Sequence, residues 1–163
     1  GRVEYSDRAD SIFAAELAAK RELIAERIEL NGENVLVTHT KFDIGSLKQI
    51  FDDDIYSVAR GVETNPLVLQ IQFPTPRSVS ALSGIFGRAR FQVTAQVCGA
   101  SEDCATYTSV FNFADAVPGQ FSGPRAEMKF DRAPARVSML RVEILYLDAG
   151  ADAHVHVFEM KIQ

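Results

Sequence analysis

The sequence contains no tryptophan, two cysteines and three histidines in 163 residues. Two thiols with no histidine at a ligand spacing cannot supply the four ligands of a structural zinc site, so we expect none. The longest apolar runs are only a few residues, whereas a transmembrane helix needs about 20. The N-terminus also lacks the charged-then-apolar pattern of a secretory signal. We therefore expect membrane attachment only through an anchor upstream of this sequence.

Excess positive charge is absent as well. The formal net charge is −5, with 22 acidic and 17 basic side chains, and no basic stripe is available to neutralise phosphates. This excludes nucleic acid as an expected partner. A chain of this length with 47% hydrophobic residues can bury a core of its own.

Signatures of catalysis are missing too. No G-x-S-x-G elbow is present, and the segment Gly84-Ile-Phe-Gly87 has the wrong spacing for a phosphate-binding loop. His154 and His156 lie two apart on an expected strand and so share a face, which is more typical of surface or cross-strand partners than of a metal site. We expect a protein that is not an enzyme.

Cys98 and Cys104 flank the turn-forming sequence Gly-Ala-Ser-Glu-Asp. Two strand ends on either side of such a turn are close enough for a disulfide, which would stabilise the fold by about 2 kcal/mol. A pair of free cytosolic thiols is the alternative. The disulfide implies an oxidising compartment, so we expect an extracytoplasmic protein, whether periplasmic, cell-surface or secreted.

Residues 6–30 have the period of a helix, because Phe13, Leu17, Ile24 and Ile28 fall on one stripe. The pair Asn31-Gly32 supplies a left-handed stop. We therefore expect residues 1–32 to form an N-terminal helix, either packed on the domain or serving as a stalk, and able to associate with a second copy.

Residues 33–163 read as short extended segments separated by turns. Residues 41–45 are expected to be a loop and 46–51 one helical turn, while Pro74 and Pro76 are expected to end a strand because proline cannot donate to the ladder. Residues 148–152 read as a hairpin turn. The expected strands are 35–38, 67–73, 79–85, 90–97, 106–113, 125–130, 137–147 and 153–162, with 114–124 as a loop. This spacing predicts an all-β, antiparallel sandwich behind one helix.

Four segments resemble motifs of the discoidin, or coagulation-factor type C, domains and the related carbohydrate-binding modules. Residues 51–57 (FDDDIYS) resemble the family's F-D-G-D-x-x-T loop, and 65–73 (NPLVLQIQF) resemble its N-P-x-I-x-I-D-F strand. Residues 135–142 (ARVSMLRV) are similar to its A-R-Y-V-R-L-x-V strand, and 158–162 (FEMKI) to its closing L-x-E-I-E-V segment. The chain departs from the loop motif at Asp53, where the family has glycine, and at Ser57, where it has threonine.

The resemblance implies a galactose-binding-like jelly roll and a non-catalytic module that binds glycans within a larger envelope or secreted protein. It also implies calcium beside the acidic loop, held by Asp52, Asp54, Ser57 and Glu159. Calcium prefers several oxygen ligands in an irregular loop, although a solvated turn is the plainer interpretation of three adjacent carboxylates.

Glycan recognition needs an aromatic platform and a few polar groups. Tyr56 lies in a loop that the resemblance places near an end of the sandwich, with Arg60 beside it as a donor and Tyr107 as the aromatic candidate on a strand. A tyrosine packed under a loop is the alternative for each ring. The absence of tryptophan favours a second function, a protein-interaction or structural domain whose partner is an envelope protein.

Overall fold

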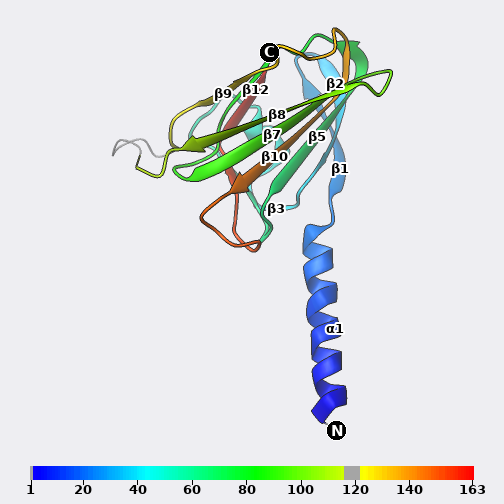
Figure 1. The fold of residues 1–163 in the computed structure, drawn as a ribbon, viewed down its shortest axis with the longest axis vertical. Coiled ribbons are helices and arrows are strands. Elements are labelled where there is room, and N and C mark those ends of the chain that lie inside the picture. The colour runs from blue at the N-terminus through cyan, green and yellow to red at the C-terminus, as the bar shows by residue number, and fades with distance from the viewer. Residues whose placement is uncertain (1, 116–121) are drawn as a thin grey trace.

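The computed structural model describes residues 2–115 and 122–163 as an N-terminal helix followed by a β-sandwich (Figure 1). Two helices are present in these residues, α1 (Arg2–Arg21) and the single turn α2 (Leu47–Ile50). The strands are β1 (Ile24–Leu30), β2 (Glu33–His39), β3 (Phe42–Ile44), β4 (Ala59–Gly61), β5 (Leu67–Arg77), β6 (Ala81–Ile85), β7 (Arg90–Gly99), β8 (Cys104–Asn112), β9 (Ala126–Lys129), β10 (Val137–Tyr146), β11 (His156–Val157) and β12 (Glu159–Ile162).

The strands form three sheets in which every pairing is antiparallel. The largest sheet has the order β1-β2-β5-β10-β7-β8, and the two smaller ones have the orders β11-β4-β3 and β12-β6-β9. One hydrophobic core joins them, because its buried side chains come from the large sheet and from both small sheets. The expected all-β antiparallel sandwich is confirmed.

Strand β7 illustrates why the sequence folds in this way. Phe91, Val93, Ala95 and Val97 are buried, whereas the polar residues between them are only partly covered. This alternation places one face of the sheet on the core and the other toward solvent. The neighbours β5 and β10 contribute Leu69, Ile71, Leu140, Val142 and Ile144 to the same core.

The helix predicted for residues 6–30 is wrong in its last part. Helix α1 ends at Arg21, and Ile24–Leu30 forms strand β1, which pairs with β2 along its whole length. Asn31 and Gly32 have φ values of 53° and 83°, the left-handed pair of a two-residue hairpin. The Asn-Gly pair therefore turns a strand instead of ending a helix.

Three other local expectations are also corrected. The expected loop at 41–45 contains β3, which pairs with β4. The expected single strand at 153–162 is two short strands in different sheets, so residues 148–152 link two sheets and do not close a hairpin. Strand β5 continues through Pro74 and Pro76 to Arg77, and its pairing with β10 shifts register at that point. The expected turn of helix at 46–51 is confirmed as α2, and the loop expected at 114–124 lies partly outside the described residues.

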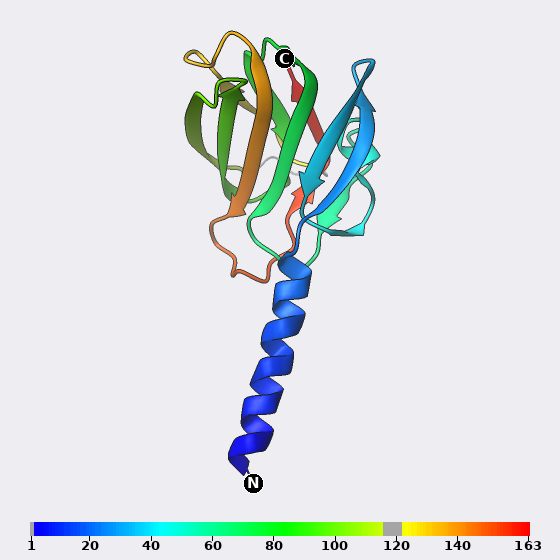
Figure 2. The ribbon, with the colours of Figure 1, turned by 90° about the vertical axis from the view of Figure 1, so that its right-hand side faces the viewer.

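Helix α1 extends away from the sandwich, at the end opposite the C-terminus (Figure 2). At its base, Lys41 Nζ donates to the Ala19 carbonyl oxygen at 2.8 Å, and Lys20 pairs with Glu63 at 3.2 Å. Ile12 and Phe13 are 53% and 68% exposed. Among the described residues, no helix is long and apolar enough to cross a membrane. A stalk role for α1 and self-association through it stay predictions.

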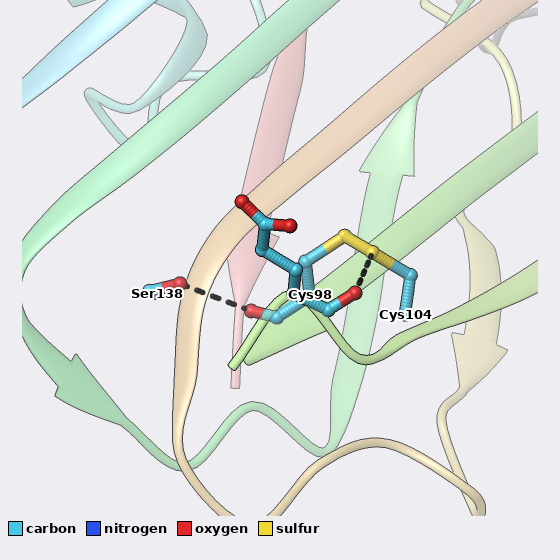
Figure 3. The surroundings of a disulfide bond; sticks show 4 residues. Cys98, Cys104 and Ser138 are labelled. Atoms are coloured by element: carbon cyan, nitrogen blue, oxygen red, sulfur yellow. Dashed lines mark hydrogen bonds between the residues drawn. A yellow bond between two sulfur atoms is a disulfide. The ribbon is translucent and has the colours of Figure 1, made fainter. Parts of the chain in front are cut away.

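The predicted disulfide between Cys98 and Cys104 is confirmed (Figure 3). The two residues are direct partners in the β7–β8 pairing, so the bond closes the tip of this hairpin. The Ser138 hydroxyl donates to the Cys98 carbonyl oxygen at 3.4 Å, which links the hairpin to β10. Cys104 Sγ lies 3.6 Å from the Glu102 carbonyl oxygen, a contact that is not a hydrogen bond because a disulfide sulfur carries no proton.

Candidate functional site

Four polar side chains gather on the small sheet β11-β4-β3, and we call them the polar cluster: Asp43, Arg60, His154 and His156. Arg60 on β4 donates to Asp43 on β3 through Nε at 2.9 Å and through Nη2 at 2.8 Å. His156 on β11 is the direct cross-strand partner of Arg60. Opposed residues of an antiparallel pair share one face of the sheet, so Arg60 and His156 face the same way.

His154 joins the cluster from just before β11. Its Nδ1 lies 2.7 Å from the Gly61 carbonyl oxygen and 3.5 Å from Asp43 Oδ2. A carbonyl oxygen only accepts, so Nδ1 carries the proton and Nε2 is the acceptor in the neutral ring. The cluster therefore offers both donors and acceptors.

Next to the polar cluster lies a mostly apolar pocket of about 460 Å³, which we call the apolar pocket. Four segments line it: Val58, Gly87–Ala89, Tyr146, and His156 with Phe158. His156 belongs to both features. Its ring is nearly parallel to that of Phe158, at 16° and a centroid distance of 6.2 Å. The pocket thus combines aromatic walls with polar groups at one margin.

Tyr146 fixes the inner wall of the pocket. Its hydroxyl donates to the Phe86 carbonyl oxygen and accepts the His156 amide at 3.2 Å. Burial raises the pKa of Tyr146 to about 12, so the hydroxyl stays protonated near neutral pH. Gly87 has a φ of 104°, and a Cβ added there would lie 2.8 Å from the Tyr146 oxygen. A side chain at position 87 would therefore both strain the backbone and intrude on the pocket.

The charges of the polar cluster are set by burial and by neighbouring groups. Burial lowers the pKa of His156, and the positive charge of Arg60 lowers it further, so the ring is neutral at physiological pH. The hydrogen bond from Arg60 lowers the pKa of Asp43, and the charge of the Arg60 guanidinium lowers it further. The same hydrogen bond raises the pKa of Arg60. Asp43 and Arg60 thus stay ionised.

Of the three residues predicted from the sequence to bind a ligand, Arg60 lies in the polar cluster. Tyr56 lies in the loop between α2 and β4 and is 77% exposed, two residues before Val58 of the apolar pocket. Tyr107 lies on β8, where its ring packs on Phe130 and its hydroxyl accepts the Arg132 amide at 2.7 Å. The ring of Tyr107 is thus engaged within the fold, and the ligand roles of all three residues stay predictions.

The residues predicted to hold calcium are brought into one region, but their oxygens point largely to the protein. Ser57 Oγ donates to Asp52 Oδ2 at 2.7 Å, and the Tyr56 amide donates to Asp54 Oδ1 at 2.9 Å. Glu159 is bound by Arg125 at 2.6 Å. Within residues 2–115 and 122–163, no group of three or more His, Cys, Asp or Glu side chains is placed to hold a metal ion. As arranged, these residues do not fit calcium, because their oxygens are engaged within the protein.

Three residues of the site, Asp43, Arg88 and Phe158, were not predicted from the sequence. Alternation along 154–158 placed His154 and His156 on one face, and this is borne out, since Val155 between them and Val157 after them are fully buried. Asp43 carried no signal because its partner Arg60 is 17 residues away on a neighbouring strand. The apolar pocket is assembled from segments 58, 87–89, 146 and 156–158, which only the fold brings together.

Solved structures with the same fold include carbohydrate-binding modules and a lectin domain. A pectin-binding carbohydrate-binding module matches with a TM-score of 0.56 and 12% identity, over 86% of this chain and 92% of that one. The CBM32 module of AlyQ, in complex with 4,5-unsaturated mannuronic acid, matches with a TM-score of 0.57 and 10% identity, over 85% and 98%. A CBM32 module of CpGH89 from Clostridium perfringens, in complex with GlcNAc-alpha-1,4-galactose, matches with a TM-score of 0.56 and 18% identity, over 85% and 95%.

No family model and no curated protein matches the sequence. At these identities the structural matches establish the fold alone. The fold that the resemblance implied, a galactose-binding-like β-sandwich, is thus confirmed.

Proposed function

We propose that this domain is a non-catalytic, extracytoplasmic carbohydrate-binding module, and that a sugar ring sits in the apolar pocket against the polar cluster. The observation that carries the proposal is the junction at His156, where an aromatic-walled pocket meets an ion pair that is only partly exposed. Sugars present apolar C–H faces and a rim of hydroxyls, so they match this combination.

The ion pair has hydrogen-bonding capacity left for hydroxyl groups. A guanidinium carries five N–H donors, and Arg60 uses one on Nε and one on Nη2 for Asp43. The remaining donors, and the second lone pairs of the Asp43 oxygens, suit two neighbouring hydroxyls of one sugar. Because the pair is fixed in bidentate geometry, little side-chain entropy is lost when a ligand binds.

Arg88 adds a second cationic side chain at the margin of the pocket. Together with Arg60 it brings positive charge to this margin, in a chain whose net charge is −5. Modules of the same fold are described in complex with mannuronic acid and as binding pectin. Acidic and neutral glycans therefore both belong in the test.

The test is a titration of the domain with a glycan panel that includes pectin, alginate, GlcNAc-alpha-1,4-galactose and Lewis b antigen. Charge-assisted hydrogen bonds contribute about 1.5–3 kcal/mol, so Arg60→Gln should weaken binding roughly 10- to 100-fold. The matched control is Arg27→Gln on the edge strand β1, where the side chain is exposed. Tyr56→Ala and Tyr107→Ala test the residues predicted from sequence. The proposal would be contradicted if no glycan of the panel binds. It would also be contradicted if Arg60→Gln and the control lose the same affinity.

A second candidate function is protein interaction through α1. Ile12 and Phe13 are exposed on a helix that projects from the sandwich. Neighbouring exposed apolar side chains of this size favour the binding of a partner protein that covers them. Light scattering of the chain and of a variant with both residues changed to serine tests this function. Assembly that is lost in the variant would support interaction, and a monomer in both would count against self-association.

A further inference from the structure

A second charged cluster lies around Glu159 on β12, and it is separate from the apolar pocket. The Glu159 side chain is 1% exposed, and Arg125 Nη2 donates to its Oε2 at 2.6 Å. The other oxygen, Oε1, is buried and has no hydrogen-bond partner among the described residues. Lys161 Nζ lies 3.5 Å from this oxygen and 2.9 Å from Asp53 Oδ1.

These groups face a common pocket of about 270 Å³. Its lining includes Asp53, Glu159 and Lys161, with Phe51 and Asn31 beside them. Glu159 and Lys161 are two apart on β12, so both project from the same face of the strand. The Lys161 ammonium thus stands between the buried carboxylate and the acidic loop 52–54.

A positive charge at this place has a clear electrostatic reason. A buried carboxylate is costly unless it is paired, and the adjacent acidic side chains repel it. Arg125 neutralises one oxygen of Glu159 and leaves the other without a hydrogen bond. The Lys161 ammonium lies 3.5 Å from that second oxygen and supplies a positive charge beside it.

The backbone of the acidic loop is compatible with this arrangement. Asp53 occupies the place of the family's glycine, and it adopts the left-handed conformation directly, with a φ of 64°. Aspartate tolerates that region better than most residues. The turn brings Asp53 Oδ1 to Lys161, while Asp52 and Asp54 accept bonds from within the loop.

We propose that Lys161 is a built-in cation that takes the place of a divalent metal ion between the acidic loop and Glu159. The native domain then needs no metal to hold this loop, and removal of the Lys161 charge uncovers a latent site for a divalent cation. Carboxylate oxygens in a short loop, together with a buried carboxylate, are ligands that Ca²⁺ accepts.

The experiment compares the native chain with Lys161→Met and with the control Lys129→Met, whose side chain is exposed at the end of β9. Melting temperatures are measured with CaCl₂ and with a chelator, and calcium affinity is measured by calorimetry. We expect no calcium effect for the native chain or the control. For Lys161→Met we expect a lower Tm in chelator, restored by calcium, with a Kd of roughly 10⁻⁴–10⁻³ M.

A calcium-dependent rise in the Tm of the native chain, or stoichiometric calcium binding by it, would overturn the proposal. So would a Lys161→Met variant that folds and gains no calcium affinity. If Lys161→Met does not fold, Lys161→Gln with Tb³⁺ in place of Ca²⁺ gives the same comparison by luminescence, since Tyr56 lies in the loop to sensitise the ion. The glycan titration of Arg60→Gln is independent of these outcomes.

Discussion

The substitution Tyr146→Phe tests how the wall of the apolar pocket is held. It removes one hydroxyl that donates to the Phe86 carbonyl oxygen and accepts the His156 amide at 3.2 Å. The ring itself stays, so its packing near Phe91, at a centroid distance of 6.4 Å, is retained. Leaving buried backbone groups without a partner costs about 1–3 kcal/mol, and we expect a loss near 2 kcal/mol in the free energy of unfolding.

For a chain of this size each kcal/mol shifts the Tm by about 2–4 °C, so the expected fall is about 4–8 °C. Urea unfolding followed by circular dichroism measures the change, because the chain has no tryptophan to follow by fluorescence. The matched control is Tyr107→Phe, whose hydroxyl only accepts the amide of exposed Arg132, a bond that water can replace. We expect it to cost less than about 1 kcal/mol. A loss for Tyr146→Phe no larger than that for the control would refute the reasoning.

Three more predictions concern the hairpin, the pocket and the ion pair. Changing both Cys98 and Cys104 to serine should lower the free energy of unfolding by about 2 kcal/mol, measured by urea titration, and an unchanged midpoint would count against it. Gly87→Ala should cost about 1–3 kcal/mol through its positive φ and should also weaken glycan binding; a stable variant with intact binding would contradict the account of the pocket. Because Arg60 lowers the pKa of Asp43 in the folded state, that pair stabilises the fold above the ordinary value of 3.8, and its contribution is lost as the pH falls through the folded pKa. The free energy of unfolding of Asp43→Asn should therefore change less with pH at acidic pH than that of the native chain. An identical pH dependence for both chains would refute this.

The strands of the core could be predicted because their signal is local. Alternation in 90–97 and the apolar run in 137–147 each depend on neighbours in the sequence, and both became strands with only small shifts of their ends. The disulfide could be predicted for the same reason, since its turn separates the two cysteines by six positions.

Segment 24–30 could not be assigned locally. Its apolar residues fit either a helical stripe or an alternating strand, and Asn31-Gly32 serves equally as a helix stop or as a hairpin turn. Pairing with β2 decides the outcome, and that pairing exists because Val35 and Val37 are themselves held in the core. Long-range packing here overrides helical propensity.

Even less of the candidate site could be predicted from the sequence. Arg60 was singled out from its neighbourhood in the chain, but its partner Asp43 and the pocket residues come from distant segments. Tyr56 was chosen for its loop, and it is exposed. The aromatic wall, however, includes His156 and Phe158, which lie about 100 residues later in the sequence. Lys161 was overlooked because a lysine on a closing strand carries no signal until the fold places it beside Asp53.

The most direct test of the proposed function is to map amide shifts of the ¹⁵N-labelled domain on titration with oligogalacturonate and, separately, with GlcNAc-alpha-1,4-galactose. Binding as proposed predicts that saturable shifts centre on Val58, on Gly87–Ala89 and on His156–Phe158, and that Arg60→Gln needs a roughly 10- to 100-fold higher sugar concentration to reach them. Saturable shifts centred elsewhere, or no shifts with either sugar, would contradict glycan recognition in the apolar pocket.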